Sequence, residues 1–232
     1  MIRIQTFDES KFDRIFVFGD LHGSFELFIK MIEKINLTKS DLIVILGDSC
    51  DRGEHSANLY FKYKELEQNG YNIFHILGNH ELMLYEALFL GEHFSQVQMW
   101  LRNGGGNTID SFKEFYKKPL LMLNKEIFWL KEYIGQMPHI LTSDSYIFVH
   151  AGYDTRRSLK HQDIDYVTWS RERFWLYNTT GKEIYYGHMP NEDNQIHIRE
   201  NSVFSMDVGA VFFENLKILE VKSKREFEVS LK

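Results

Sequence analysis

Three segments of the chain share one design: IFVFGDLHG (15–23), LIVILGDSCDRG (42–53) and NIFHILGNHE (72–81). Each segment starts with a short run of apolar, β-branched or aromatic residues, which is typical of a buried strand. Each run leads directly into a turn built of glycine and polar residues. The sequence therefore predicts strands over Ile15–Phe18, Leu42–Leu46 and Asn72–Leu77.

Helical patterns follow the three turns, and this alternation of strands with helices indicates an α/β domain. The expected helices cover Phe25–Ile35, Ala57–Gln68 and Glu81–Leu90. The next stretch, Glu92–Gly135, is predicted to be mainly helical with a break at NGGGN (103–107). The three glycines of this break permit backbone conformations that are closed to other residues.

The second half of the chain is predicted to be largely β. Its expected strands are Tyr146–Val149, Glu183–Tyr186, Gln195–Ile198, Val203–Met206, Val211–Phe213, Lys217–Val221 and Phe227–Leu231. In the C-terminal stretch, charges alternate with apolar residues as in a half-exposed edge strand. No linker rich in proline, glycine or serine separates the halves, so we expect a single domain over residues 1–232. The predicted fold is α/β, with two mixed β-sheets packed as a sandwich and flanked by helices.

Composition argues against several classes of protein. With 232 residues, 44% of them hydrophobic, the chain has enough apolar material for a stable globular core. The formal charge of −6 argues against a nucleic-acid partner, because binding to phosphate backbones depends on lysine and arginine. No apolar run approaches the ~18–20 residues that span a bilayer, so no membrane partner is expected. The N-terminal residues lack the apolar core of a secretory signal and Cys50 is the single cysteine, which together favour a cytoplasmic location.

The turns after the predicted strands carry side chains that bind metals. The first three turns contain Asp20, His22, Asp48, Asp51, Asn79 and His80. In open α/β sheets ligands bind beyond the carboxyl ends of the strands, so we expect these side chains to converge. VHAG (149–152) and YGHMP (186–190) place His150 and His188 after two further strands. One such turn alone is ordinary turn chemistry, but five of them predict a metal site, and carboxylate with imidazole suits Mn²⁺, Fe²⁺ or Zn²⁺.

The ordered motifs resemble those of the calcineurin-like metallophosphoesterases, and within them the phosphoprotein phosphatase branch. The blocks of that branch run GDxHG, GDxxDRG, GNHE, HAG and GH, and all five stand in this order between Gly19 and His188. The segments WSRER (169–173), QIHI (195–198) and DVGAVF (207–212) make the chain especially similar to the small bacterial and phage (lambda-type) serine/threonine phosphatases.

The resemblance implies a dinuclear metal centre that supplies a metal-activated hydroxide. Asp48 would bridge the two ions. The remaining ligands would be Asp20 and His22 at one ion, and Asn79, His150 and His188 at the other. The expected cofactors are two divalent cations, with Mn²⁺ favoured and Fe or Zn as alternatives.

The resemblance also implies which residues act on the substrate. His80 resembles the general acid that protonates the leaving oxygen, and Asp51 would hold its other ring nitrogen. Arg52 and Arg171 resemble the arginines that bind the non-bridging phosphate oxygens through charge-assisted hydrogen bonds.

Leu77 departs from the family pattern, and Cys50 needs a separate interpretation. Leu77 stands where many relatives carry an arginine, so a phosphate contact is either missing or supplied by Arg156 or Arg157. Cys50 lies between two site carboxylates, where a thiol could sense oxidation or fill the turn, and we favour packing.

The preferred function is that of a metal-dependent phosphomonoesterase, a serine/threonine phosphoprotein phosphatase with phosphotyrosine as a further candidate substrate. The alternative is a symmetrical dinucleoside polyphosphate (Ap4A) hydrolase, because those enzymes share the first three motifs. They need a pocket for a second nucleoside, and this short chain leaves less sequence for one. A non-catalytic metal-binding module is disfavoured, because the ligand set and the His80–Asp51 pair are complete. The expected partner is a phosphorylated protein or a small phosphoester.

Overall fold

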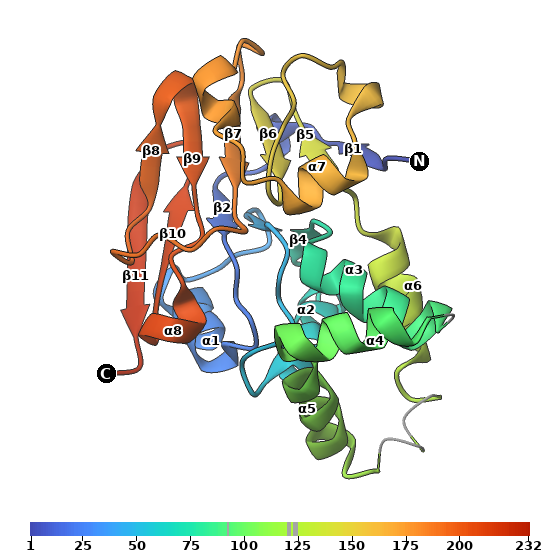
Figure 1. The fold of residues 1–232 in the computed structure, drawn as a ribbon. Coiled ribbons are helices and arrows are strands. Elements are labelled where there is room, and N and C mark those ends of the chain that lie inside the picture. Colours follow the sequence, from blue (N-terminus) through green and yellow to red (C-terminus); the bar gives the residue numbers. More distant parts are fainter. Residues whose placement is uncertain (92, 120–121, 123–124) are drawn as a thin grey trace.

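The computed structural model describes residues 1–91, 93–119, 122 and 125–232 as two β-sheets with flanking helices (Figure 1). The larger sheet has the order β1-β5-β6-β7-β9-β8 and the smaller one the order β11-β10-β2-β3-β4. The strands of the larger sheet are β1 (Ile4–Thr6), β5 (Ile140–Thr142), β6 (Tyr146–Val149), β7 (Glu183–Tyr186), β8 (His197–Arg199) and β9 (Val203–Ser205). Those of the smaller sheet are β2 (Ile15–Phe18), β3 (Leu42–Ile45), β4 (Asn72–His75), β10 (Asn215–Glu220) and β11 (Arg225–Ser230).

The smaller sheet explains why the first three motifs meet. Strands β2, β3 and β4 are parallel neighbours, and every residue of β2 and β3 is buried. Continuous apolar runs of this kind are typical of parallel strands that are covered on both faces. Because the three strands run in the same direction, the loops that follow them emerge at the same edge of the sheet.

The helices lie outside the sheets, as predicted. They are α1 (Phe25–Lys34), α2 (Ser56–Gln68), α3 (Asn79–Tyr85), α4 (Phe94–Trp100), α5 (Gly106–Tyr116), α6 (Phe128–Gln136), α7 (Ile164–Trp169) and α8 (Ala210–Phe213). Figure 1 shows α2 to α6 gathered on one side of the molecule, with α1 and α8 beside the C-terminal strands. Among the helices of the described residues, none has both the length and the apolar character needed to cross a membrane.

One hydrophobic core joins the two sheets. Phe148, Tyr185 and Phe204 of the larger sheet belong to the same buried cluster as the residues of β2 and β3. The ring of Tyr185 stacks on Phe148 and Phe204, with centroids 5.3 and 4.7 Å apart. The two-sheet sandwich with flanking helices is therefore confirmed, whereas the single domain over residues 1–232 stays a prediction.

The prediction of a strand at Val211–Phe213 is wrong, because these residues belong to the one-turn helix α8. Gly209 and Glu214 flank the turn with left-handed φ angles of 67° and 52°. The Asp207 carboxylate accepts a hydrogen bond from the Gly209 N–H at 2.9 Å, which turns the chain at the end of β9. The β-branched and aromatic composition is therefore overridden by turn geometry at both ends.

Other differences concern short elements. Strands β1 and β5 and the helix α7 are absent from the sequence predictions, and each has only three to six residues. Among the described residues, β11 pairs with β10 alone and forms the edge of the smaller sheet, as its alternating pattern predicts.

The predicted break at NGGGN is present. Helix α4 passes into a π-helical turn, η3 (Leu101–Gly105), and then into α5. Gly104 has a φ angle of 103°, a left-handed value that an L-residue rarely adopts. The helical axis changes direction at this glycine.

Candidate metal centre

Five loops meet between the two sheets. Three follow β2, β3 and β4 of the smaller sheet, and two follow β6 and β7 of the larger sheet. Two groups of side chains in these loops place their possible ligand atoms within 4.8 Å of one another: His22, Asp48 and His80 in one, and Asp48, His150 and His188 in the other. Asp48 belongs to both groups, so it lies at the centre of the site.

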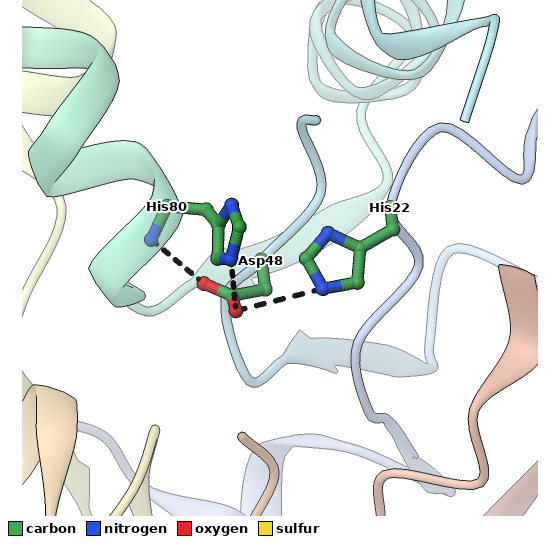
Figure 2. A group of neighbouring side chains, drawn as sticks. All are labelled: His22, Asp48 and His80. Atoms are coloured by element: carbon green, nitrogen blue, oxygen red, sulfur yellow. Dashed lines mark hydrogen bonds and ion pairs between the residues drawn. The ribbon is translucent and has the colours of Figure 1, made fainter. Parts of the chain in front are cut away.

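The two oxygens of the Asp48 carboxylate face different imidazoles. Oδ1 lies 3.4 Å from His150 Nε2, whereas Oδ2 lies 3.7 Å from His22 Nε2 and 3.8 Å from His80 Nε2. Figure 2 shows His22 and His80 on opposite sides of this carboxylate. The backbone N–H of His80 also donates to Oδ1 at 3.0 Å, which fixes the orientation of the carboxylate. A carboxylate with its oxygens divided in this way has the arrangement of a bridging ligand.

Backbone carbonyls orient two of the imidazoles. His22 Nδ1 donates to the Cys50 carbonyl at 2.7 Å, and His150 Nδ1 donates to the Leu46 carbonyl at 2.7 Å. In each ring the proton is thereby held on Nδ1, and the lone pair of Nε2 points into the site. Metal-binding histidines are commonly fixed by such a hydrogen bond from the other ring nitrogen.

The second group is completed by Asn79. Its side-chain oxygen lies 2.8 Å from His150 Nε2 and 3.0 Å from His188 Nδ1. Within the part of the chain that the structure describes, the buried Nε2 of His188 has no hydrogen-bond partner. Buried polar atoms are nearly always paired. An unpaired imidazole nitrogen in a cluster of this kind is consistent with metal binding.

The protonation states of the site also fit metal ions. Burial lowers the pKa of His22 well below its usual value, with the neighbouring charge of His80 adding to the effect. Burial and the charge of His150 lower the pKa of His188 to about 3. Burial opposes ionisation of Asp48, but the adjacent His150 and His80 outweigh it and hold its pKa well below the usual range. Neutral His22 and His188 and an ionised Asp48 are the forms that bind divalent cations. His150 differs, because burial favours its neutral form but the negative charge of Asp48 outweighs burial and raises the pKa of His150. A cation bound at Asp48 would offset that charge and favour the neutral imidazole.

Asp20 contacts the second group through the backbone. Its oxygens accept from the His188 N–H at 3.0 and 3.2 Å, and it is almost fully buried. Burial, Asp207 and Asp48 raise its pKa well above the usual value. Asp20 is not a member of either compact group, whereas His80 is. Three buried carboxylates near one another repel, and divalent cations would offset that repulsion.

The predicted acid pair is formed. His80 Nδ1 donates to Asp51 Oδ2 at 2.7 Å, and its Nε2 faces the centre. Both side chains are almost completely buried. Burial raises the pKa of Asp51, and the hydrogen bonds from His80, Thr108 and Trp100 oppose that shift.

The two arginines that were predicted to bind phosphate, Arg52 and Arg171, occupy different positions around the site. Arg52 lies across the first group, with Nη2 at 3.0 Å from His80 Nε2 and Nη1 against His22 Nε2. Arg171 is exposed and lines an open cavity of about 470 Å³ next to Trp169, whose ring lies 6.2 Å from that of His188.

The candidates for replacing the arginine missing at Leu77 are already paired. Arg156 Nε contacts Asp154 at 2.7 Å, and Arg157 Nε contacts the same carboxylate at 3.4 Å. Both arginines are largely exposed. Leu77 itself is buried and its N–H donates to the Pro138 carbonyl. The ion pairs with Asp154 hold both arginines in the loop that follows β6.

The loops hold unusual backbone conformations. His22, Asp48, Asp51, Arg52 and His188 have positive φ angles between 41° and 70°. Such angles are uncommon outside glycine and cost free energy, and they are concentrated at functional sites where the surrounding structure enforces them. Backbone strain is therefore present at five of the residues to which the site chemistry is assigned.

Glu81, the last residue of GNHE, supports the loop of Asp48 and was not assigned a role from the sequence. Its carboxylate accepts from the backbone N–H groups of Asp48 and Ser49 at 2.7 and 2.8 Å, and from the Tyr60 hydroxyl at 2.8 Å. The signal available in the sequence is its position three residues after Gly78, the arrangement of a helix-capping glutamate.

Cys50 is fully buried behind the loop of Asp48. Burial and the neighbouring carboxylates of Asp51 and Glu81 raise the pKa of its thiol well above the usual value. A buried thiol that stays protonated is unreactive, which supports the packing interpretation.

Comparison with known proteins places this geometry in a family. The family described as calcineurin-like phosphoesterase matches residues 13–218. Serine/threonine-protein phosphatase 1 of Salmonella typhimurium is 27% identical over 94% of this chain and 96% of its own length. Serine/threonine-protein phosphatase 2 of the same organism is 28% identical over 96% and 99%. The asymmetrical bis(5'-nucleosyl)-tetraphosphatase PrpE of Bacillus cereus is 26% identical over 91% and 95%.

Solved structures share the fold. A protein whose name assigns it to the diadenosine tetraphosphatases superposes with a TM-score of 0.74 at 17% identity, covering 99% of this chain and 98% of that one. The cold-active protein-tyrosine phosphatase of a Shewanella species gives a TM-score of 0.65 at 15% identity, covering 98% and 80%. The match over residues 13–218 shows that the chain belongs to the calcineurin-like phosphoesterases and is a metal-dependent phosphoesterase hydrolase.

Proposed function

We propose that the chain is a phosphoprotein phosphatase that hydrolyses phosphoserine and phosphothreonine, with phosphotyrosine as a further substrate. The observation that carries the proposal is the division of the two Asp48 oxygens between His150 on one side and His22 with His80 on the other. A carboxylate placed in this way serves a site for two cations and the displacement of a phosphate ester. The relatives named as serine/threonine phosphatases cover nearly the whole chain, which supports the substrate class.

We propose that two divalent cations, Mn²⁺ in preference to Fe or Zn, bind around Asp48, and that His80 acts on the substrate and is not a ligand. Their ligands would be Asp48 between them, Asp20 and His22 at one, and Asn79, His150 and His188 at the other. When bound, such ions polarise the phosphoryl group and activate water.

The chain's own residues supply the remaining chemistry. His80 would give a proton from Nε2 to the leaving oxygen after Arg52 has moved from that nitrogen to the phosphate, because its Nδ1 is held by Asp51 and its Nε2 faces the centre. Arg52 would hold the non-bridging phosphate oxygens from across the first group, and Arg171 would do so from the side of His188. The left-handed backbone of Arg52, with a φ of 64°, and the hydrogen bond of His80 to Asp51 hold these two donors at the site before substrate binds.

A second candidate function is the hydrolysis of dinucleoside polyphosphates. Proteins named as asymmetrical and as symmetrical bis(5'-nucleosyl)-tetraphosphatases are 26% and 33% identical to this chain, the latter over only 38% of it. Coverage does not separate the two candidates, because the asymmetrical tetraphosphatase also covers 91% of the chain. The phosphoprotein substrate is preferred on the slightly higher identity of the two phosphatases, 27% and 28% against 26%.

The deciding experiment compares a phosphothreonine peptide with diadenosine tetraphosphate on the Mn²⁺-reconstituted protein at matched concentrations. A kcat/KM that favours the peptide by about tenfold or more, a difference of about 1.4 kcal/mol in transition-state binding, supports the proposal. Preference for the dinucleotide replaces it with the second candidate. Absence of turnover on both, with the metal bound, overturns both.

A further inference from the structure

The helical segment Phe94–Tyr116, α4–η3–α5, does more than cover the site, because two of its side chains contact Asp51. We infer that Trp100 and Thr108 are positioning residues for the Asp51–His80 pair, and that the glycine turn between them brings both donors to one carboxylate. The inference deepens the proposed function and rests on its assignment of His80 as the proton donor.

Three donors surround the Asp51 carboxylate. His80 Nδ1 donates to Oδ2 at 2.7 Å, and the Thr108 hydroxyl donates to Oδ1 at 2.6 Å. The indole N–H of Trp100 is shared between the oxygens, at 2.9 Å from Oδ1 and 3.1 Å from Oδ2. Trp100 is 1% exposed and Thr108 is fully buried, so water does not replace these bonds.

Thr108 binds the loop as well as the carboxylate. Its hydroxyl oxygen accepts from the backbone N–H of Asp51 at 2.8 Å, and the same hydroxyl lies 3.3 Å from Ser56 Oγ. Asp51 has a left-handed φ of 70°, so its backbone needs an external partner to hold that conformation. One threonine therefore fixes both the main chain and the side chain of Asp51.

The glycine turn makes this arrangement sterically feasible. A Cβ at Gly105 would lie 2.5 Å from the indole ring of Trp100, and a Cβ at Gly104 would lie 2.7 Å from the backbone nitrogen of Arg52. Gly104 also accepts from the Arg52 N–H at 3.3 Å, and the Asn107 side chain donates to the Arg52 carbonyl. The turn thus packs against the Trp100 ring on one side and the Asp51–Arg52 loop on the other.

Loss of the outer donors should loosen the pair rather than remove it. Loss of the Trp100 N–H or of the Thr108 hydroxyl leaves the Asp51 carboxylate with two of its three donors, so it can take more orientations, and the imidazole of His80 follows its Nδ1 partner. The Nε2 of His80, which lies 3.8 Å from Asp48 Oδ2, then leaves the position from which it would protonate a leaving group. The defect should depend on how much the leaving group needs a proton.

The test uses Trp100→Phe, which keeps a ring but removes the N–H, and Thr108→Val, which keeps the shape but removes the hydroxyl. Each Mn²⁺-loaded variant is assayed on a phosphoserine peptide, whose alkoxide needs a proton, and on 4-nitrophenyl phosphate, whose phenolate leaves without one. We expect kcat on the peptide to fall about tenfold, kcat on the aryl phosphate to change by less than about threefold, and both KM values to be retained. Thr108→Ser should restore the peptide activity.

Two control variants distinguish a failure of this inference from a failure of the proposed function. Gly106→Ala is the matched control in the same turn, because a Cβ there meets nothing within 4 Å. His80→Asn is assayed on the same two substrates.

The outcomes distinguish the inference from the proposed function. If His80→Asn selectively loses activity on the peptide but neither positioning variant does, the inference fails and the proposed function stands. If His80→Asn shows no selectivity, the proton-donor assignment itself fails. Equal losses on both substrates in Trp100→Phe and Thr108→Val indicate a structural role only and overturn the inference. Should Trp100→Phe not fold, as judged by thermal unfolding, Thr108→Val decides.

Discussion

The strand-end loops and the helical segment α4–η3–α5 meet at Asp51, and they hold the site by different means. The loops after β2, β3 and β4 use backbone: left-handed φ angles at His22, Asp48 and Asp51, and carbonyls that orient imidazoles. The helical segment uses side chains, the Trp100 indole and the Thr108 hydroxyl. Backbone-held ligands are fixed by the sheet itself, whereas side-chain donors depend on the packing of a separate segment. Substitutions in the strand-end loops and in the helical segment should therefore have different effects on metal binding, activity and stability.

The largest effect is expected for Asp48→Asn, which changes the central carboxylate of the strand-end loops. An amide lacks the charge that offsets two cations and cannot bridge them with equivalent oxygens, so metal content should fall to one ion or none per chain. Activity should fall by roughly 10³-fold or more. The measurement is the metal content of purified protein by elemental analysis together with turnover of an aryl phosphate.

The control for this change is Asp110→Asn, an exposed acidic residue on α5 that pairs with Lys113. It should retain metal and activity. Normal metal content in Asp48→Asn would contradict the central role that the geometry gives to Asp48.

The next largest effect is expected for His80→Asn, which removes chemistry without removing the bridging ligand. The kcat on a phosphoserine peptide should fall by about 10²–10⁴-fold, the range for loss of a general acid, while both ions remain bound. The checks are kcat and KM with elemental analysis on the same preparation. Loss of the metals in this variant would make His80 a ligand, in line with its membership of the first compact group, rather than the proton donor.

The same comparison explains which parts of the site the sequence could predict. Asp20, His22, Asp48, Asn79 and His80 directly follow short buried strands, so local patterns and the direction of the strands were enough to bring them together. His150 and His188 come from the other sheet; their turns were counted among the five that predict a metal site, but their assignment to one ion depended on the family resemblance. Trp100 and Thr108 lie 49 and 57 residues from Asp51 in the chain. No local pattern links them to it.

The fold shows the same division between local and non-local signals. Strands β2 and β3 are wholly apolar and were predicted almost to the residue. Strands β1 and β5 have three residues each. β1 pairs with β5 across 136 residues of sequence, and β5 also pairs with β6. Val211–Phe213 has strand composition, but left-handed turns on both sides make it helical. Short elements of this kind are decided by tertiary contacts rather than by propensity.

A smaller effect is expected from substitutions at two adjacent glycines, Gly105 and Gly106, which test the helical segment and leave the strand-end loops unchanged. Gly105→Ala would place a Cβ 2.5 Å from the Trp100 ring, and should lower the free energy of unfolding by about 1–3 kcal/mol as the ring is displaced. Gly106→Ala has open space and a helical φ of −56°, so it should be neutral or stabilising by up to about 1 kcal/mol. The measurement is urea unfolding of both variants beside the unmodified chain. Equal stabilities would show that the turn accommodates the ring without strain and would weaken its role as a fixed spacer.

The smallest effect concerns His139, which directly precedes β5 and belongs neither to the strand-end loops nor to the helical segment. Its Nδ1 accepts from the Arg3 N–H at 2.9 Å, and burial together with the charge of Arg3 lowers its pKa from 6.5 to about 4. Because the folded pKa is the lower one, the unfolded chain binds more protons between pH 6.5 and 4. The contribution of His139 is therefore fully present above pH 6.5 and is lost as the pH falls toward 4. Between pH 7 and pH 5 this loss should amount to about 1–2 kcal/mol.

His139→Asn, which keeps an acceptor for Arg3 but does not titrate, should reduce the change in unfolding free energy between pH 7 and pH 5 by that amount. An unchanged slope would mean that His139 is already protonated in the folded protein at pH 5, and that its hydrogen bond with Arg3 does not hold it neutral.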